Sequence, residues 1–112
     1  MSGISTHVLD TSTGHPARDI GVLLEIETSP GSWRDIAHGI TDQDGRIAEL
    51  FPGPLIAGNY RLRFDVARYF ELRRVPAFYP FVNITFKVED IAQHYHVPVL
   101  LSPFGYSTYR GS

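Results

Sequence analysis

The sequence predicts an all-β fold, a sandwich or a barrel, with one short helix. Three observations lead to this prediction. Apolar and polar residues alternate with a period of two over most of the chain, as in half-buried strands. Turn-forming Gly, Pro, Asp and Ser residues separate the alternating runs, and only one segment has helical spacing. At 112 residues the chain is expected to form a single domain, residues 1–112.

The predicted strands number about eight. The clearest alternation covers Phe81–Asp90, where the even-numbered positions from 82 to 88 are apolar and the odd-numbered ones polar. Asn59–Val66 shows the same pattern, and Val22–Thr28 shows it less cleanly. The other expected strands are Ser5–Leu9, Trp33–Ile40, Arg46–Leu50, His94–Leu101 and Tyr106–Tyr109.

The single helix is expected over residues 65–73. Its apolar residues recur at the i, i+3, i+4 and i+7 positions of one helix face. Asp65 is a candidate N-cap, and Pro76 closes the region. Val66, Tyr69, Phe70 and Arg73 follow this spacing, and Leu72 widens the stripe.

Composition excludes several classes of protein. The absence of cysteine rules out disulfides, a thiol nucleophile and iron–sulfur clusters. A net charge of −2 argues against nucleic-acid binding, which depends on neutralising phosphates. Apolar runs such as Val97–Leu101 are far shorter than a membrane span. Residues 1–20 lack the pattern of a secretory signal, so we expect a cytoplasmic protein that contacts neither nucleic acid nor membrane.

Three of the five histidines stand out by position. His94 and His96 are separated by one residue in a predicted strand, so their imidazoles project from one sheet face about 6.5–7 Å apart. Such a pair fits a metal site, a shared polar site or an exposed face. His7 lies in the first strand and faces with Ser5 and Leu9. No third clustered ligand supports a metal, whereas His15 and His38 are expected in a turn and on the surface.

Arginine and hydroxyl groups supply further candidates. Arg46 follows the turn Asp42–Gly45, where a guanidinium can either clamp a carbonyl or oxyanion or remain exposed. The C-terminal residues Tyr109–Ser112 form a polar cluster if the tail is held down, and a loose tail otherwise. Glu25 and Glu27 share a strand face, and we interpret them as solvated. The sequence contains no G-x-S-x-G elbow, phosphate loop or dinucleotide fingerprint.

Several motifs together resemble the transthyretin-related protein family. They are Ile4–Thr11 followed by Gly14–Ala17, then Thr41-Asp42-x-x-Gly45-Arg46 and Phe78-Tyr79-Pro80. The strongest match is His94–Pro103 followed by the terminal Tyr109-Arg110-Gly111-Ser112. The resemblance covers essentially the whole chain. The terminal YRGS is the hallmark of the 5-hydroxyisourate hydrolases of this family and is lacking in transthyretin, the hormone carrier of the same fold.

The resemblance implies a transthyretin-like sandwich of two four-stranded sheets with one short helix, at about residues 65–73. It also implies a homotetramer, built as a dimer of dimers, with active sites in the channel between the dimers. The implied reaction is the hydrolysis of 5-hydroxyisourate to 2-oxo-4-hydroxy-4-carboxy-5-ureidoimidazoline in urate breakdown. No metal or organic cofactor is implied. The alternatives are a non-catalytic carrier that uses the same channel and, more remotely, a histidine-based metal-binding sandwich.

The implied catalytic residues are His7, Arg46, His96 and Ser112. One imidazole would act as general base on water and the other as a proton donor or an orienting group, and the resemblance leaves open which is which. Arg46 would hold the substrate and stabilise the developing charge, and the Ser112 carboxylate would orient an imidazole. The implied substrate-binding residues are His7, Arg46, Tyr109, Arg110 and Gly111, with Arg110 either touching substrate or anchoring the tail. His94 is interpreted as structural, and Phe81 departs from the Glu that many relatives carry there.

Overall fold

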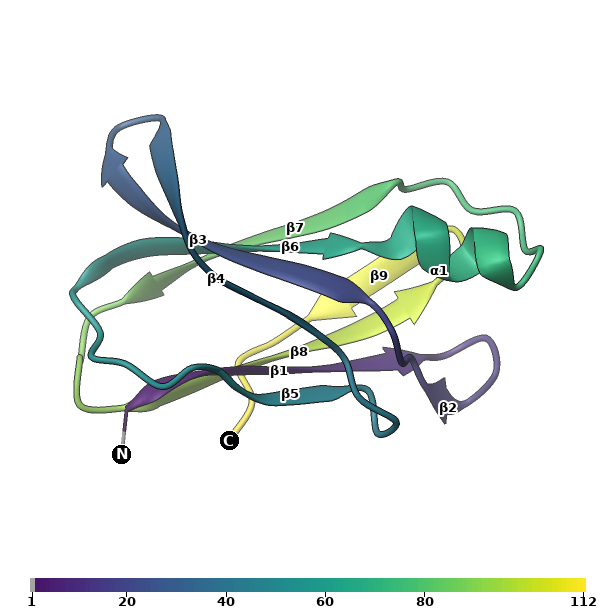
Figure 1. Ribbon diagram of the computed structural model, residues 1–112, viewed down its shortest axis with the longest axis horizontal. Helices are drawn as coiled ribbons and strands as arrows, with labels where there is room; N and C mark the ends of the chain where they lie inside the picture. The colour runs from purple at the N-terminus through teal and green to yellow at the C-terminus, as the bar shows by residue number, and fades with distance from the viewer. Residues whose placement is uncertain (1) are drawn as a thin grey trace.

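The computed structural model describes residues 2–112 and shows two β-sheets packed face to face (Figure 1). The four-stranded sheet has the order β4-β3-β6-β7. The five-stranded sheet has the order β2-β1-β8-β9, with β5 also paired to β1. The elements are β1 (Gly3–Asp10), β2 (His15–Pro16), β3 (Gly21–Ser29), β4 (Ser32–Ile40), β5 (Arg46–Phe51), β6 (Gly58–Asp65), α1 (Val66–Leu72), β7 (Phe81–Val88), β8 (His94–Ser102) and β9 (Gly105–Thr108).

The predicted all-β sandwich is confirmed, and one detail of it is corrected. The resemblance implied four strands in each sheet, but the sheet containing β1 has five. The additional strand is the two-residue β2, which pairs antiparallel with the end of β1 through Leu9↔Pro16 and Asp10↔His15. The turn Thr11–Gly14 between them is a tight reversal, so the chain folds back onto β1 immediately after leaving it.

Strand β1 lies between two partners whose registers place the candidate residues side by side. It runs parallel to β8, with Ser5 opposite His96 and Gly3 opposite His94. It runs antiparallel to β5, with His7 opposite Arg46. Side chains of neighbouring strands at such positions lie on the same sheet face. Three segments that are far apart in the sequence therefore contribute to one surface.

Alternation along β1 separates the core from this surface. Ile4, Thr6 and Val8 are fully buried between the sheets, whereas Ser5 and His7 point to the opposite face. Burying an aliphatic or aromatic side chain of this size contributes roughly 1.5–3 kcal/mol, which fixes the register because a one-residue slip would exchange the two faces. The largest fully buried side chains of the core include Tyr60, Phe64, Phe70, Ile4, Leu24 and Leu62.

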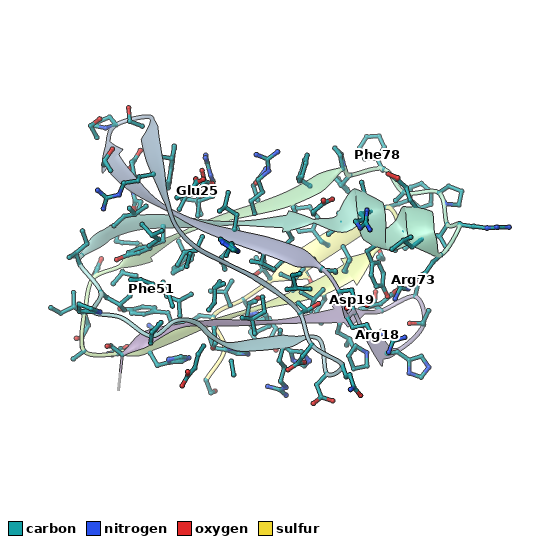
Figure 2. All side chains as sticks on the ribbon, viewed as in Figure 1. Arg18, Asp19, Glu25, Phe51, Arg73 and Phe78 are labelled. Carbon is teal, nitrogen blue, oxygen red and sulfur yellow. The ribbon has the colours of Figure 1, made fainter. Side chains whose placement is uncertain are left out.

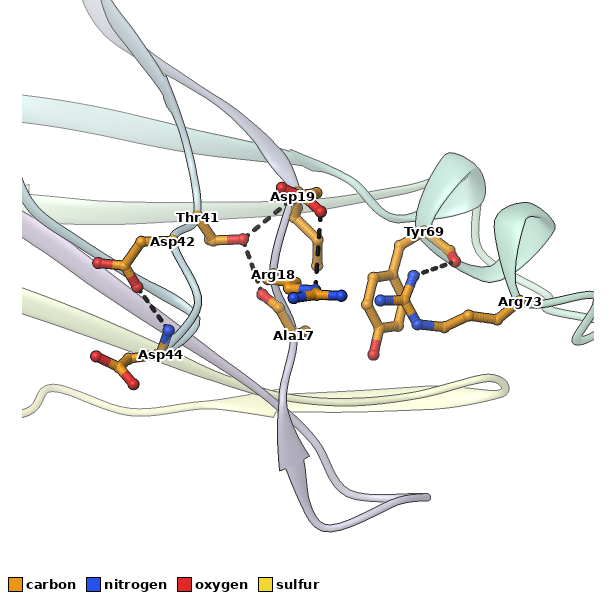
Figure 3. Close-up of polar contacts among 9 residues, drawn as sticks. Ala17, Arg18, Asp19, Thr41, Asp42, Asp44, Tyr69 and Arg73 are labelled. Carbon is orange, nitrogen blue, oxygen red and sulfur yellow. Dashed lines mark hydrogen bonds and ion pairs between the residues drawn. The ribbon is translucent and has the colours of Figure 1, made fainter.

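Helix α1 buries Val66, Tyr69 and Phe70, as the spacing predicts. Leu72 was expected to widen this stripe, but 65% of it is exposed, because it lies on the solvent side of the final turn. Asp65 occupies the N-cap position without a side-chain capping hydrogen bond. Figure 3 shows Arg73 folding back over Tyr69; its guanidinium lies 3.7 Å from the ring centroid and donates to the Tyr69 carbonyl.

The loop before β5 is held by short polar contacts that position Arg46. The Asp42 carboxylate accepts the backbone N–H groups of Asp44 and Arg46 at 2.8 and 3.0 Å. Gly45 has φ +72°, and a Cβ there would collide with the Val8 carbonyl oxygen. The Val8 N–H donates to the Gly45 carbonyl at 2.7 Å. Close approach of the turn to β1 therefore requires glycine at this position.

A second polar contact holds the segment between β2 and β3 in place. The buried Thr41 hydroxyl accepts the Ile20 N–H and donates to the Ala17 carbonyl, at 2.9 and 2.8 Å (Figure 3). These bonds join the start of the loop before β5 to the segment that leads into β3. The end of β4 and the approach to β3 are thereby held together beside the Arg46 turn.

The four-stranded sheet carries a charged contact that the sequence did not predict. Glu25, labelled in Figure 2, was expected to be solvated. Only 8% of it is exposed. Arg61 donates to both of its carboxylate oxygens, at 2.8 and 3.0 Å, and also lies 4.2 Å from the Trp33 ring centroid. Phe81 is on the same sheet, covered by the Arg63 guanidinium at 3.9 Å. Neither Glu25 nor Phe81 belongs to the sheet that carries His7.

Candidate active site

The outer face of the five-stranded sheet collects imidazole and guanidinium groups from three strands. β1 contributes His7, β5 contributes Arg46, and β8 contributes His94 and His96. His7 and His96 are half-buried, whereas Arg46 and His94 are exposed. The predicted grouping of His7, Arg46 and His96 on one surface is what the strand registers produce. The structure also adds His94 to this group.

The Ser5 hydroxyl joins two of the imidazoles. Its Oγ lies 2.7 Å from Nε2 of His94 and 2.7 Å from Nδ1 of His96. Ser5 points outward from the sheet, yet it is only 6% exposed, because the two rings cover it. The hydrogen bond leaves Nε2 of His96 as the ring nitrogen that is not engaged by Ser5.

The electrostatic surroundings favour the neutral form of His96. Burial lowers the pKa of His96 below its ordinary value, and the nearby charges of His7, Arg46 and His94 lower it further. A cation is destabilised both by loss of water and by neighbouring positive charge. Near neutral pH, His96 is therefore an uncharged imidazole that can accept a proton.

The C-terminal tail is held against His96. Gly111 forms an isolated bridge with His96, and its N–H donates to the His96 carbonyl at 2.8 Å. A Cβ on Gly111 would lie 2.6 Å from Cδ2 of the His96 ring and 3.1 Å from the Pro98 side chain. The tail is thus tied down rather than loose, and Figure 1 shows the C-terminus beside the sheet of β1, β5 and β8. Ser112, which follows directly, is exposed.

Tyr109 and Arg110, two other predicted site residues, lie away from His7 and Arg46. The Arg110 guanidinium lies 4.5 Å from the Tyr95 ring centroid and donates to the Gln93 side chain at 2.5 Å. Of the two roles considered for Arg110, these contacts favour anchoring of the tail. Tyr109 and Arg110 line a cavity of about 210 Å³ beside β7 and β8, which His96 borders and which includes neither His7 nor Arg46.

Sequence reasoning missed the contact of Ser5 with His94 and His96. Ser5 was placed on the face of His7, and His94 was given a structural role. The signal was present, because Ser5 and His7, like His94 and His96, are i, i+2 pairs on strands. Only the parallel register of β1 with β8 places Ser5 between the two rings. Within residues 2–112 no group of three or more His, Cys, Asp or Glu side chains is arranged to hold a metal ion.

The fold and the site together define a transthyretin-like β-sandwich that carries a histidine–arginine cluster on one sheet face. The chain belongs to the HIUase/Transthyretin family, whose sequence model matches residues 4–111. It is 46% identical over 110 residues to the 5-hydroxyisourate hydrolase of Salmonella dublin, covering 97% of this chain and 80% of that protein. It is 41% identical to the 5-hydroxyisourate hydrolase of Mus musculus, covering 99% of this chain and 96% of that one.

Solved structures agree on the fold and include proteins of two names, 5-hydroxyisourate hydrolase and transthyretin. The 5-hydroxyisourate hydrolase of Klebsiella pneumoniae superposes with a TM-score of 0.85 at 37% identity, covering 97% of this chain and 98% of that one. Transthyretin from Sparus aurata superposes with a TM-score of 0.90 at 31% identity, covering 96% and 95%. Backbone similarity therefore does not separate the two kinds of protein, and any distinction must come from the side chains. In the part of the chain that the structure describes, no helix is long and apolar enough to cross a membrane.

Proposed function

We propose that this protein is a hydrolase that opens the ring of 5-hydroxyisourate to give 2-oxo-4-hydroxy-4-carboxy-5-ureidoimidazoline, a step of purine breakdown. The observation that carries the proposal is the convergence of His7, Arg46 and His96 on one sheet face, with the YRGS tail bound to His96. The names and identities of the Salmonella dublin and Mus musculus relatives support the same substrate. The reaction is the hydrolysis of a cyclic amide.

The proposed chemistry uses uncharged imidazole at His96 and positive charge at Arg46. Nε2 of His96 accepts a proton from a water molecule while the oxygen of that water attacks the amide carbonyl carbon of the substrate. The Arg46 guanidinium binds the carbonyl oxygen and stabilises its negative charge in the tetrahedral intermediate. The carbon–nitrogen bond then breaks, and the ring nitrogen takes a proton from His7 or from His96. The Ser112 carboxylate, next to Gly111, completes the site by orienting an imidazole.

The proposal includes the assembly. We propose a homotetramer, a dimer of dimers, in which the His7 face of one protomer meets that of another. On a single chain this face is open, since Arg46 and His94 are exposed. Association would enclose the substrate and exclude water from the charged groups, which strengthens their effect. Light scattering should then give about four times the 12.6 kDa of one chain, and a monomer at assay concentration would contradict this arrangement.

The second candidate function is a carrier. Its support is the similarity to Sparus aurata transthyretin, one solved structure of which is a complex with thyroxine. A carrier needs an apolar channel and gains nothing from three imidazoles and a guanidinium on one face. This cluster therefore favours the hydrolase.

Generating the substrate in place tests the proposal. Urate oxidase converts urate to 5-hydroxyisourate, and its ultraviolet absorbance then decays slowly without a catalyst. Addition of the protein should accelerate the decay, and His96→Ala should abolish the acceleration. His38→Ala, on the other sheet and exposed, is the matched control and should leave the rate unchanged. A wild-type protein that does not accelerate the decay would overturn the proposal.

A further inference from the structure

The contact between Ser5, His94 and His96 restricts where the hydrogen atoms can lie. Both ring nitrogens are 2.7 Å from Ser5 Oγ, which is the distance of a true hydrogen bond. A serine hydroxyl has one hydrogen to donate and lone pairs to accept. If Ser5 donates to one ring, the other ring must donate to Ser5. The two imidazoles therefore face Ser5 in opposite states, one with N–H and one with a lone pair.

This restriction links the exposed ring to the half-buried one. When Nε2 of His94 carries a hydrogen, Ser5 donates to Nδ1 of His96, and the neutral His96 ring must carry its hydrogen on Nε2. When Nε2 of His94 is a lone pair, Ser5 donates to His94, and Nδ1 of His96 carries the hydrogen. Only in the second state is Nε2 of His96 free to accept a proton from water.

We propose that His94, acting through the Ser5 hydroxyl, is a positioning residue that decides which nitrogen of His96 carries the hydrogen. Protonated His94 has hydrogen on both ring nitrogens, so it enforces the state in which His96 cannot act as a base through Nε2. Neutral His94 permits the active state. The role in catalysis rests on the proposed hydrolase function, whereas the coupling of the two rings rests on the contact itself.

The same contact provides a balanced proton path. When Nε2 of His96 takes a proton from water, the hydrogen on Nδ1 passes to Ser5 Oγ, and the Ser5 hydrogen passes to Nε2 of His94. His96 is then neutral with hydrogen on Nε2, and the positive charge is on the exposed His94 ring. The reverse transfers restore the starting state when Nε2 of His96 protonates the leaving nitrogen. No atom or charge is gained or lost over the cycle.

The charges around the two rings explain why the positive charge is better placed on His94. His96 faces His7 from β1 and Arg46 from β5, and these charges, like burial, lower its pKa. His94 is exposed and lines a hollow that it shares with Glu49 of β5. A positive charge on the His94 ring therefore lies beside water and on the side of a carboxylate. Moving the charge from His96 to His94 takes it away from two cationic groups.

Nitrogen NMR of histidine-labelled protein tests the coupling without any substrate. Ring-nitrogen shifts report which nitrogen carries hydrogen. In the wild type, the Nδ1 and Nε2 signals of His96 should report a change of tautomer over a pH series, because addition of a proton to His94 reverses the hydrogen bonds of Ser5. In His94→Gln, which keeps the reach and polarity of the side chain but does not titrate, this change should disappear. His38→Gln is the matched control and should behave as the wild type.

Kinetics supply the second measurement. The pH profile of kcat should lose one titrating proton from its acid side in His94→Gln, so the limiting slope of log kcat falls by about one. Ser5→Ala should lower kcat by about tenfold to a hundredfold, which is the usual loss when a hydrogen-bonding partner that orients a functional histidine is removed. It should also remove the His94-dependent part of the profile. The thermal unfolding midpoint should stay close to that of the wild type in His94→Gln, because that ring is exposed.

The outcomes separate the two proposals. If His94→Gln leaves both the His96 tautomer and the pH profile unchanged in an active enzyme, the coupling is overturned and the hydrolase proposal stands. If the wild type is inactive but its His96 tautomer still follows His94, the coupling stands and the hydrolase proposal fails. If Ser5→Ala does not fold, the exposed His94→Gln variant still decides the question.

Discussion

The two ends of β1 hold polar clusters of opposite design. At its end, the Asp10 carboxylate accepts hydrogen bonds from the backbone N–H and hydroxyl of Ser12 and from the Tyr69 phenol at 2.7 Å. Asp10 is 1% exposed and Tyr69 is 4% exposed. Near its start, Ser5 contacts two imidazoles beside His7 and Arg46 on an outward face. We call the Asp10–Tyr69 cluster closed, because its polar groups are buried and bonded to one another. We call the cluster of Ser5, His7, Arg46, His94 and His96 open, because it faces outward from the sheet.

The difference lies in how each cluster balances charge. The hydrogen bonds to Asp10 outweigh the effect of burial and hold its pKa below the ordinary value. Burial and the Asp10 contact raise the pKa of Tyr69 to about 12. Each partner thereby stabilises the ordinary form of the other. The His7 face gathers imidazoles and the Arg46 guanidinium instead, and the described side chains there supply no carboxylate partner to His96. A cluster whose polar groups are paired within the chain stabilises the fold, whereas a cluster with imidazoles and an arginine but no carboxylate side chain is suited to bind an anionic or polar substrate.

The largest expected effect is on activity, from the open cluster. His96→Ala should lower kcat by about 10²–10⁴-fold, since it removes a general acid–base group. The unfolding free energy should change little, because the ring is half-buried and borders open space. Measuring the decay of 5-hydroxyisourate beside urea unfolding checks both statements. Retention of wild-type kcat would remove His96 from the chemistry.

Gly111→Ala should have the next largest effect. The added Cβ would press on the His96 ring at 2.6 Å and displace it, and a displacement of about 1 Å can reduce a rate by about a hundredfold. The NMR signals of His96 should shift, while those of Tyr69 should not. Ser107→Ala, in β9 and exposed, is a control for a small change in the same strand region. A fully active Gly111→Ala enzyme would show that the ring position is not critical.

Tyr69→Phe tests the closed cluster and should affect stability alone. It removes the phenol that donates to buried Asp10, and a hydrogen bond to a charged group contributes about 1.5–3 kcal/mol. Urea unfolding should show a loss of this size, with kcat unchanged for the folded protein. A loss of activity without loss of stability would mean that the two ends of β1 are coupled.

The smallest expected effect is the pH dependence of stability at the same cluster. Because the folded pKa of Asp10 is depressed, its contribution is present above the unfolded value of about 3.9 and is lost as pH falls through the folded pKa. The folded pKa of Tyr69 is raised to about 12, so its contribution is present below about pH 10 and is lost as pH rises toward 12. Asp10→Asn should flatten the acid side of a plot of unfolding free energy against pH. An unchanged acid side would contradict the assignment to Asp10.

Much of the fold could be predicted from the sequence because strand alternation is a local property. The strands over Phe81–Asp90 and Asn59–Val66 agree with β7 and β6 to within two residues. β2 was missed because two residues cannot show a period, and its pairing depends on the turn that brings it back to β1. The burial of Glu25 was missed for a similar reason, since Arg61 lies 36 residues away and no local pattern marks their contact.

The sequence by itself determined which side chains are available: histidine, arginine and hydroxyl groups without cysteine, on strands whose period assigns each a face. It also determined that His7 and Ser5 share one face of a strand, as do His94 and His96. Only the tertiary structure decided that these two faces are the same surface. The parallel register of β1 and β8 is set by burial of the apolar face of the sheet, opposite the histidines. This register places Ser5 between the rings of His94 and His96. Long-range register depends on packing of the entire core, and for that reason the link between His94 and His96 could be seen only in the folded chain.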